Sequence, residues 1–220
     1  MTARESRIRS ASLSGQIGLP VITQYLTIEN AAALLGLINV AILVRRSIWN
    51  YPFGIASVAL YTYVFFTAGL YSDTLLQPYF LLMQIYGWWN WLHGRNNDGL
   101  ARIESMSAQE RILFGTGTAL LAFVLGWTFS HFRSAAAPWM DATCAAMSIT
   151  AQYLLSIRRL ENWFLWIAVD VIYVALYWWK GLHATSFLYA VFLVLSIAGL
   201  IEWQREYRTH VSTPARTAAA

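Results

Sequence analysis

Apolar runs of nearly equal length dominate this chain and alternate with short polar breaks. A bilayer core of about 30 Å needs roughly 20 apolar residues of α-helix to cross it. Seven runs reach that length, near 27–44, 51–68, 74–93, 112–130, 139–157, 162–179 and 185–203. The pattern predicts an all-α, polytopic membrane protein with seven transmembrane helices, an N-terminal arm at 1–26 and a cytoplasmic tail at 204–220.

Composition and charge agree with a membrane protein. Hydrophobic residues make up 58% of the 220 positions and charged residues 12%, whereas roughly a quarter of the residues in soluble domains are charged. The basic residues stand in short clusters between the apolar runs, which is typical of topology signals, and nucleic-acid binding is not expected. Ten arginines share one side of the predicted membrane and five basic residues share the other. We therefore expect the N-terminus outside and the C-terminus in the cytoplasm.

The chain matches itself without a gap when it is shifted by 112 residues. The shift pairs identical or similar residues that seldom coincide by chance: Glu29 with Asp141, Arg46 with Arg158, Asn50 with Asn162, Tyr61 with Tyr173, Gly87 with Gly199 and Trp91 with Trp203. We interpret this as a duplication, with three-helix repeats at 27–93 and 139–203. The loop and linker helix in 94–138 would restore a parallel relation between the copies, which is a transporter design.

One face of the sixth run carries the residues that point to a ligand. Asn162, Trp166, Asp170, Tyr173 and Tyr177 follow at i, i+4, i+8, i+11 and i+15, which places them on one side of a helix. A carboxylate at mid-membrane costs about 2.5–3.5 kcal/mol to insert, so Asp170 should face the bundle interior or a water-filled cavity. It could bond two helices, recognise a cationic ligand or take part in proton coupling. Recognition is favoured because no second carboxylate or histidine lies nearby.

Amides and indoles supply the remaining candidates. An indole offers a π face to a cationic ring, and an amide both donates and accepts hydrogen bonds. Ligand contact and bonding between helices carry equal weight for Gln84 and Gln152. Several aromatic residues are expected in an interfacial belt instead, namely Trp163, Tyr177, Trp178 and Trp179. The predicted substrate contacts are Asn162, Trp166, Asp170, Gln84, Gln152, Trp88, Tyr173 and Asn50.

The two copies differ at the predicted ligand face. Trp166 and Asp170 correspond to Gly54 and Val58 in the first copy, so the bulky polar face exists only in the second half. One half is therefore expected to grip the ligand while the other leaves room for it.

Enzymatic chemistry finds no support in the motifs. The four histidines stand apart from one another, Cys144 is the only cysteine, and the zinc-protease H-E-x-x-H and phosphate-binding G-x-x-x-x-G-K-[ST] patterns do not occur. No catalytic residue, metal or cofactor is expected. Transport would then be passive, ion-coupled or driven by another protein.

Two sets of motifs resemble one known family. The string Tyr71–Gln77, followed by Ile85–Trp88 and Trp91, and the later Glu161–Trp163 with Trp166 resemble the PnuC family of vitamin transporters. So does the order of repeat, linker and repeat.

The resemblance implies import of nicotinamide riboside by facilitated diffusion across a bacterial inner membrane. It also implies a fold like that of the SWEET sugar transporters, a homotrimer in the lipid bilayer, and trapping of the substrate by a cytoplasmic kinase. Asn162 and Trp166 correspond to family binding residues, followed by Gln84 and Gln152.

The resemblance leaves the vitamin open. Relatives take thiamine or riboflavin, and thiamine is the main alternative. Many members carry asparagine where this chain has Asp170, which favours a vitamin with a cationic ring. A membrane-embedded enzyme or an accessory subunit is the alternative from a different class.

Overall fold

The computed structural model describes residues 27–67, 71–94, 100–131 and 138–212, and these are almost entirely helical. The first helix occupies Thr27–Val44. It is followed by α2 (Asn50–Thr67), α3 (Tyr71–His93), α4 (Ala108–His131), α5 (Pro138–Ser156), α6 (Asn162–Trp179) and α7 (His183–Ser212). Over the residues that the structure describes, each predicted apolar run lies within one of these helices, to within a residue at its ends. The expected arm at 1–26 and the last residues of the expected tail lie outside the described part of the chain.

Four of these helices are long and apolar enough to cross a membrane by length and composition alone. They are Thr27–Val44, Ala108–His131, Asn162–Trp179 and a segment of α7, Thr185–Thr209. In α2, α3 and α5, amides, hydroxyls and tyrosines lower the mean hydropathy. A helix that is covered by other helices can carry such residues because they do not face lipid.

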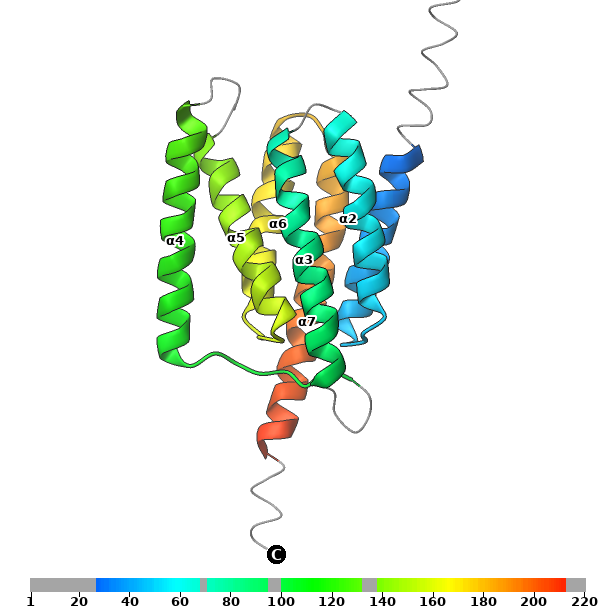
Figure 1. Cartoon of the computed structure of the whole chain (residues 1–220), viewed down its shortest axis with the longest axis vertical. Helices are drawn as coiled ribbons and strands as arrows, with labels where there is room; N and C mark the ends of the chain where they lie inside the picture. The colour runs from blue at the N-terminus through cyan, green and yellow to red at the C-terminus, as the bar shows by residue number, and fades with distance from the viewer. Residues whose placement is uncertain (1–26, 68–70, 95–99, 132–137, 213–220) are drawn as a thin grey trace, which may run out of the picture.

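The helices stand side by side, with α4 on the flank against α5 and the end of α7 projecting beyond the bundle (Figure 1). Thr118 of α4 and Thr150 of α5 share a hydrogen bond of 2.8 Å between their hydroxyls. α7 continues past the expected end at 203 as far as Ser212. An ion pair of 2.8 Å between Glu206 and Arg46 anchors this extension to the turn after the first helix.

The core is built from two aromatic pairs of the same geometry. Tyr51 meets Trp91, and Trp163 meets Trp203; in both pairs the ring centroids are 5.4 Å apart and the planes stand at 87°. A side chain at Gly87 would overlap the Tyr51 ring, and one at Gly199 the Trp163 ring. The belt prediction for Trp163 is wrong, because this indole is 1% exposed. Gly199 on α7 has no side chain, and the Trp163 ring occupies the space that a side chain there would fill.

The turns that lead into α2 and α6 also share a geometry. Arg46 and Arg158 are the non-glycine residues with positive φ in the described chain, at 58° and 62°. At each turn an asparagine folds back: Asn50 donates its side-chain N–H to the Ser47 carbonyl at 2.7 Å, and Asn162 donates to the Arg159 carbonyl at 2.6 Å.

Residues 100–107, which precede α4, cross the lower end of the bundle in Figure 1 and contact both of these turns. The Ala101 amide donates to the Arg46 carbonyl at 3.3 Å, and the Glu104 amide donates to the Arg158 carbonyl at 3.1 Å. Glu161 then accepts hydrogen bonds from the Arg111 guanidinium and the Ser105 hydroxyl. The start of α6 is thereby held against the start of α4.

Candidate substrate-binding site

Asp170 lies inside the bundle, in agreement with the prediction that it faces the bundle interior or a water-filled cavity. It is 5% exposed, and its carboxylate accepts a hydrogen bond of 2.9 Å from the Ser196 hydroxyl of α7. None of the ion pairs among the described residues includes Asp170. A buried carboxylate with a hydroxyl partner and no cation can hold a positively charged group.

Tyrosines cluster on the side of Asp170 that faces the C-terminal end of α6. Tyr173 and Tyr177 of α6 lie with ring centroids 4.8 and 5.4 Å from Tyr189 of α7. The Tyr177 and Tyr189 rings are stacked at 17°. Tyr173 therefore belongs to an aromatic cluster next to the carboxylate. Tyr177 is partly exposed near the end of α6 and stacks on Tyr189, and its belt position stays a prediction.

The first three helices contribute an amide group around Gly54. The side-chain amides of Asn39 and Gln84 occupy the space into which a side chain at Gly54 would project. Asn39 donates to the Asn50 carbonyl at 2.7 Å. The Gln84 side-chain oxygen is buried and has no hydrogen-bond partner in the described chain, so its capacity to accept a hydrogen bond is unused there.

Gln152 of α5 lies at the depth of Gln84. Two hydrogen bonds between α3 and α5 bracket the glutamines: Tyr79 donates to the Ile149 carbonyl at 2.7 Å, and Asn90 donates to the Ser156 carbonyl at 2.9 Å. The side-chain nitrogen of Gln152 is buried and has no partner in the described chain. The two helices thus offer one acceptor and one donor at similar depth.

The remaining candidates lie nearer the end of the bundle that holds the turns of Arg46 and Arg158, called here the arginine-rich end. Asn162 is fully buried and keeps its side-chain oxygen unpartnered among the described residues. Asn50 is buried in the corresponding turn. Trp88 and Trp166 are partly buried and pack against the aromatic core. Asn162 and Asp170 are separated by eight positions, about 12 Å along the helix axis, so they could contact only different parts of one ligand.

Three polar residues of this region were not expected from the sequence. Asn39 stands on the first helix, and Ser196 and Tyr189 stand on α7. Ser196 is the residue paired with Gln84 by the 112-residue shift, and that pairing could have drawn attention to it. Asn39 is an amide in the second half of the apolar stretch Thr27–Val44, and a polar residue at that depth is the signal that could have drawn attention to it.

Together these groups define a class of protein. A bundle of apolar helices encloses a carboxylate, stacked phenol rings and unpaired amide atoms, which suit a small polar ligand with a positive charge. Intramembrane polar groups of this kind mark solute pathways. The fold and site are those of a multi-pass membrane transporter.

Comparisons with known proteins name the family. Residues 26–205 match the family described as nicotinamide mononucleotide transporter, and the chain belongs to it. It is 28% identical over 194 residues to the nicotinamide riboside transporter PnuC of Neisseria mucosa, covering 83% of this chain and 74% of that protein. It is 26% identical over 201 residues to PnuC of Escherichia coli K12, covering 80% and 84%.

Two further comparisons concern substrate and fold. The riboflavin/roseoflavin transporter RibM of Streptomyces davaonensis is 28% identical over 173 residues, covering 77% of this chain and 81% of that one. A crystal structure described as the vitamin B3 transporter PnuC superposes with a TM-score of 0.70 at 25% identity, covering 96% of this chain and 94% of that chain.

Proposed function

We propose that this chain imports nicotinamide riboside by facilitated diffusion across a bacterial inner membrane. The observation that carries the proposal is Asp170, a buried carboxylate bonded to Ser196 and free of any ion pair in the described chain. Nicotinamide riboside carries a positive pyridinium ring, a carboxamide and a ribose. The carboxylate complements the ring, and the open atoms of Gln84 and Gln152 complement the carboxamide or the ribose hydroxyls.

The absence of basic residues between the membrane faces favours the riboside over the mononucleotide. A phosphate in a low-dielectric site needs a cationic partner. Thr27–Val44, α2, α3, α5 and α6 contain no lysine or arginine, and the first arginine of α7 is Arg205 near its end. A phosphorylated substrate would find no charge to compensate it beside Asp170.

The proposed architecture is two parallel three-helix repeats joined by α4, with the N-terminus outside and the C-terminus in the cytoplasm. Its support is the recurrence of one geometry at positions 112 residues apart. The Arg46 and Arg158 backbones share their positive φ, and the two aromatic pairs of the core share their distance and angle. The arginine count supports the orientation.

Passive transport is proposed because the sequence has no P-loop nucleotide-binding motif and α6 carries no carboxylate besides Asp170 to continue a proton relay. Facilitated diffusion moves the substrate only down its own gradient, so accumulation inside the cell would need a cytoplasmic kinase that phosphorylates the substrate. The proposed assembly is a homotrimer in the bilayer.

Proteoliposomes test the function directly. Labelled nicotinamide riboside should enter vesicles that contain the purified protein without any ion gradient, and a protonophore should leave the rate unchanged. Empty vesicles are the control. No flux, or flux that collapses with the protonophore, would overturn the proposal.

Competition separates the substrates. An excess of nicotinamide riboside should displace the labelled ligand, whereas nicotinamide mononucleotide and riboflavin should not. The similarity to RibM makes riboflavin the necessary comparison, and thiamine is the cationic alternative. Stronger displacement by thiamine than by nicotinamide riboside would reassign the substrate.

A further inference from the structure

Two open grooves lie at the arginine-rich end of the bundle, outside the candidate substrate-binding site. One has a volume of about 640 Å³, and its lining includes Ile42, Arg45, Trp49 and Leu195. The other has a volume of about 430 Å³ and is lined by Ile201, Gln204, Arg205, Arg208 and Thr209. Ligand pockets commonly measure about 300–1,000 Å³, so either groove can receive part of a small molecule.

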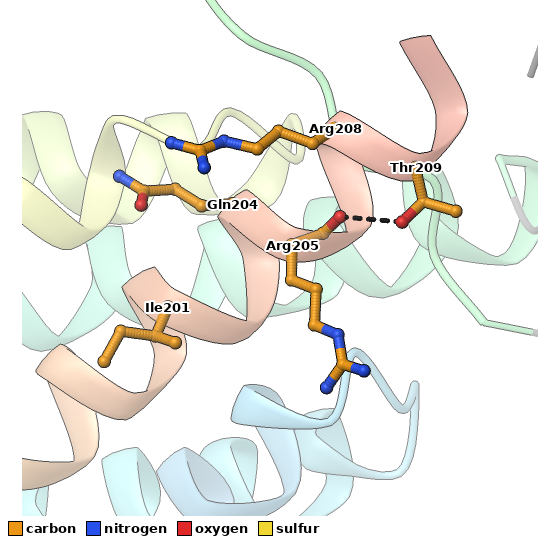
Figure 2. Close-up of a pocket in the computed structure, with 5 residues that line it drawn as sticks. All are labelled: Ile201, Gln204, Arg205, Arg208 and Thr209. Carbon is orange, nitrogen blue, oxygen red and sulfur yellow. Dashed lines mark hydrogen bonds between the residues drawn. The ribbon is translucent and has the colours of Figure 1, made fainter. Parts of the chain in front are cut away.

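The grooves are neighbours across the first helix and α7. Trp203 donates its indole N–H to the Leu43 carbonyl at 3.4 Å, and Glu206 forms its ion pair with Arg46. Figure 2 shows the Arg205 side chain extending from α7 towards the blue ribbon of the first helix and its turn, whereas Arg208 and Gln204 point to the other side. Arg205 therefore extends from its own groove towards the segment that lines the other groove.

Adjacent arginines have opposite roles here. Arg46 is buried and neutralised by Glu206, whereas Arg45 is exposed and, like Arg205, forms no ion pair with a carboxylate in the described chain. On α7 the groove residues follow at i, i+3, i+4, i+7 and i+8, which places them on one face. Glu202 and Glu206 fall outside that set, so the face is positively charged.

The surroundings of these charges are apolar and aromatic. Ile42, Leu195 and Ile201 line the grooves, and Trp49 is 67% exposed beside Arg45. Tryptophan of this kind is typical of the level of lipid headgroups. Basic pockets between transmembrane helices near the cytoplasmic face bind anionic headgroups.

We propose that these grooves bind one anionic phospholipid of the cytoplasmic leaflet. Arg45 and Arg205 hold its phosphate from the first helix and α7, as paired guanidinium groups do well. Ile42 and Leu195 pack against the upper part of an acyl chain. The lipid would bridge the first and last helices of the bundle, independently of which vitamin is carried.

Native mass spectrometry of the full chain, loaded with phosphatidylglycerol or phosphatidylcholine, tests the proposal. Wild-type protein should retain phosphatidylglycerol in preference to phosphatidylcholine. Each arginine near a membrane surface contributes about 1 kcal/mol to anionic-lipid binding. Arg45→Gln and Arg205→Gln should therefore weaken retention about five-fold each, and the double variant about thirty-fold.

Arg102→Gln is the matched control, because Arg102 is exposed at the same end of the bundle but lines neither groove. It should keep wild-type retention. Equal retention by the double variant and wild type would overturn the proposal. So would loss of the lipid on addition of inorganic phosphate alone, or a change in subunit number in the double variant, which would show that a second copy covers the grooves.

Discussion

Trp91 and Trp203 lie with their ring centroids 5.8 Å apart, and each donates a hydrogen bond to a helix from the other half of the chain. Trp91 of α3 donates its indole N–H to the Leu155 carbonyl of α5 at 3.2 Å. Trp203 of α7 donates to the Leu43 carbonyl of the first helix at 3.4 Å. These reciprocal bonds link the two halves of the bundle at its arginine-rich end.

Replacement of Asp170 by asparagine should weaken nicotinamide riboside binding by at least about ten-fold. The substitution removes the charge and keeps the shape of the side chain. If the attraction between carboxylate and ring exceeds the cost of desolvating them by about 1.4 kcal/mol, its loss raises the dissociation constant about ten-fold. Equilibrium binding of the labelled riboside measures the change. Asp141→Asn, at the start of α5, should leave affinity unchanged. An unaltered affinity in Asp170→Asn would show that the carboxylate does not recognise the ring.

Substitution of either buried glutamine, Gln84 or Gln152, should lower the affinity for the substrate without lowering the stability of the protein. Gln84→Leu and Gln152→Leu each remove one buried amide atom that has no partner in the described chain, the oxygen of Gln84 and the nitrogen of Gln152. The free energy of unfolding should therefore change little. A lost ligand hydrogen bond of about 0.5–1.5 kcal/mol should lower affinity about two- to ten-fold.

Gln77→Leu is the comparison for these variants, since Gln77 is buried on the same helix and has an interaction partner. It should lower the melting temperature in detergent and keep the affinity. If Gln84→Leu behaves like Gln77→Leu, Gln84 bonds helices and does not bind substrate.

Alanine at Gly87 or Gly199 should destabilise the bundle by about 1–3 kcal/mol. The added methyl group would overlap the Tyr51 or the Trp163 ring, and overpacking of a filled core costs about that much. Thermal unfolding in detergent measures the loss. Gly117→Ala meets no atom within 4 Å on the exposed face of α4 and should be neutral or slightly stabilising. Similar melting temperatures for all three variants would contradict the packing described.

Removal of the Glu206 charge should destabilise the projecting end of α7. Glu206→Gln leaves the buried Arg46 guanidinium without its counter-charge, which costs up to about 3 kcal/mol in a partly buried pair. Hydrogen exchange of α7 amides should increase beyond Trp203. Glu202→Gln, one turn earlier on α7, should leave exchange unaltered because Glu202 forms no ion pair in the described chain.

Helix number and position followed from sequence because a bilayer imposes them. An apolar stretch of about 20 residues has to be helical there, since every backbone N–H and C=O must be bonded within the segment. Helical periodicity also placed Asp170 on an inward face, and the buried carboxylate bonded to Ser196 agrees with it. The contacts of Gln84, Gln152 and Asn162 with a ligand stay predictions.

Only the tertiary structure decided which side chains meet. The residues around Trp163 in the sequence predict an interfacial position for it. Its ring is buried because Gly199, thirty-six positions later, leaves space for it on the facing helix. Asn39 joins Gln84 because three helices converge on Gly54. Arg45 and Arg46 are adjacent in the sequence, but the position of Glu206 places Arg46 in a buried ion pair and leaves Arg45 exposed. Helical periodicity orients a residue on its own helix, but its partners depend on how the helices pack against one another.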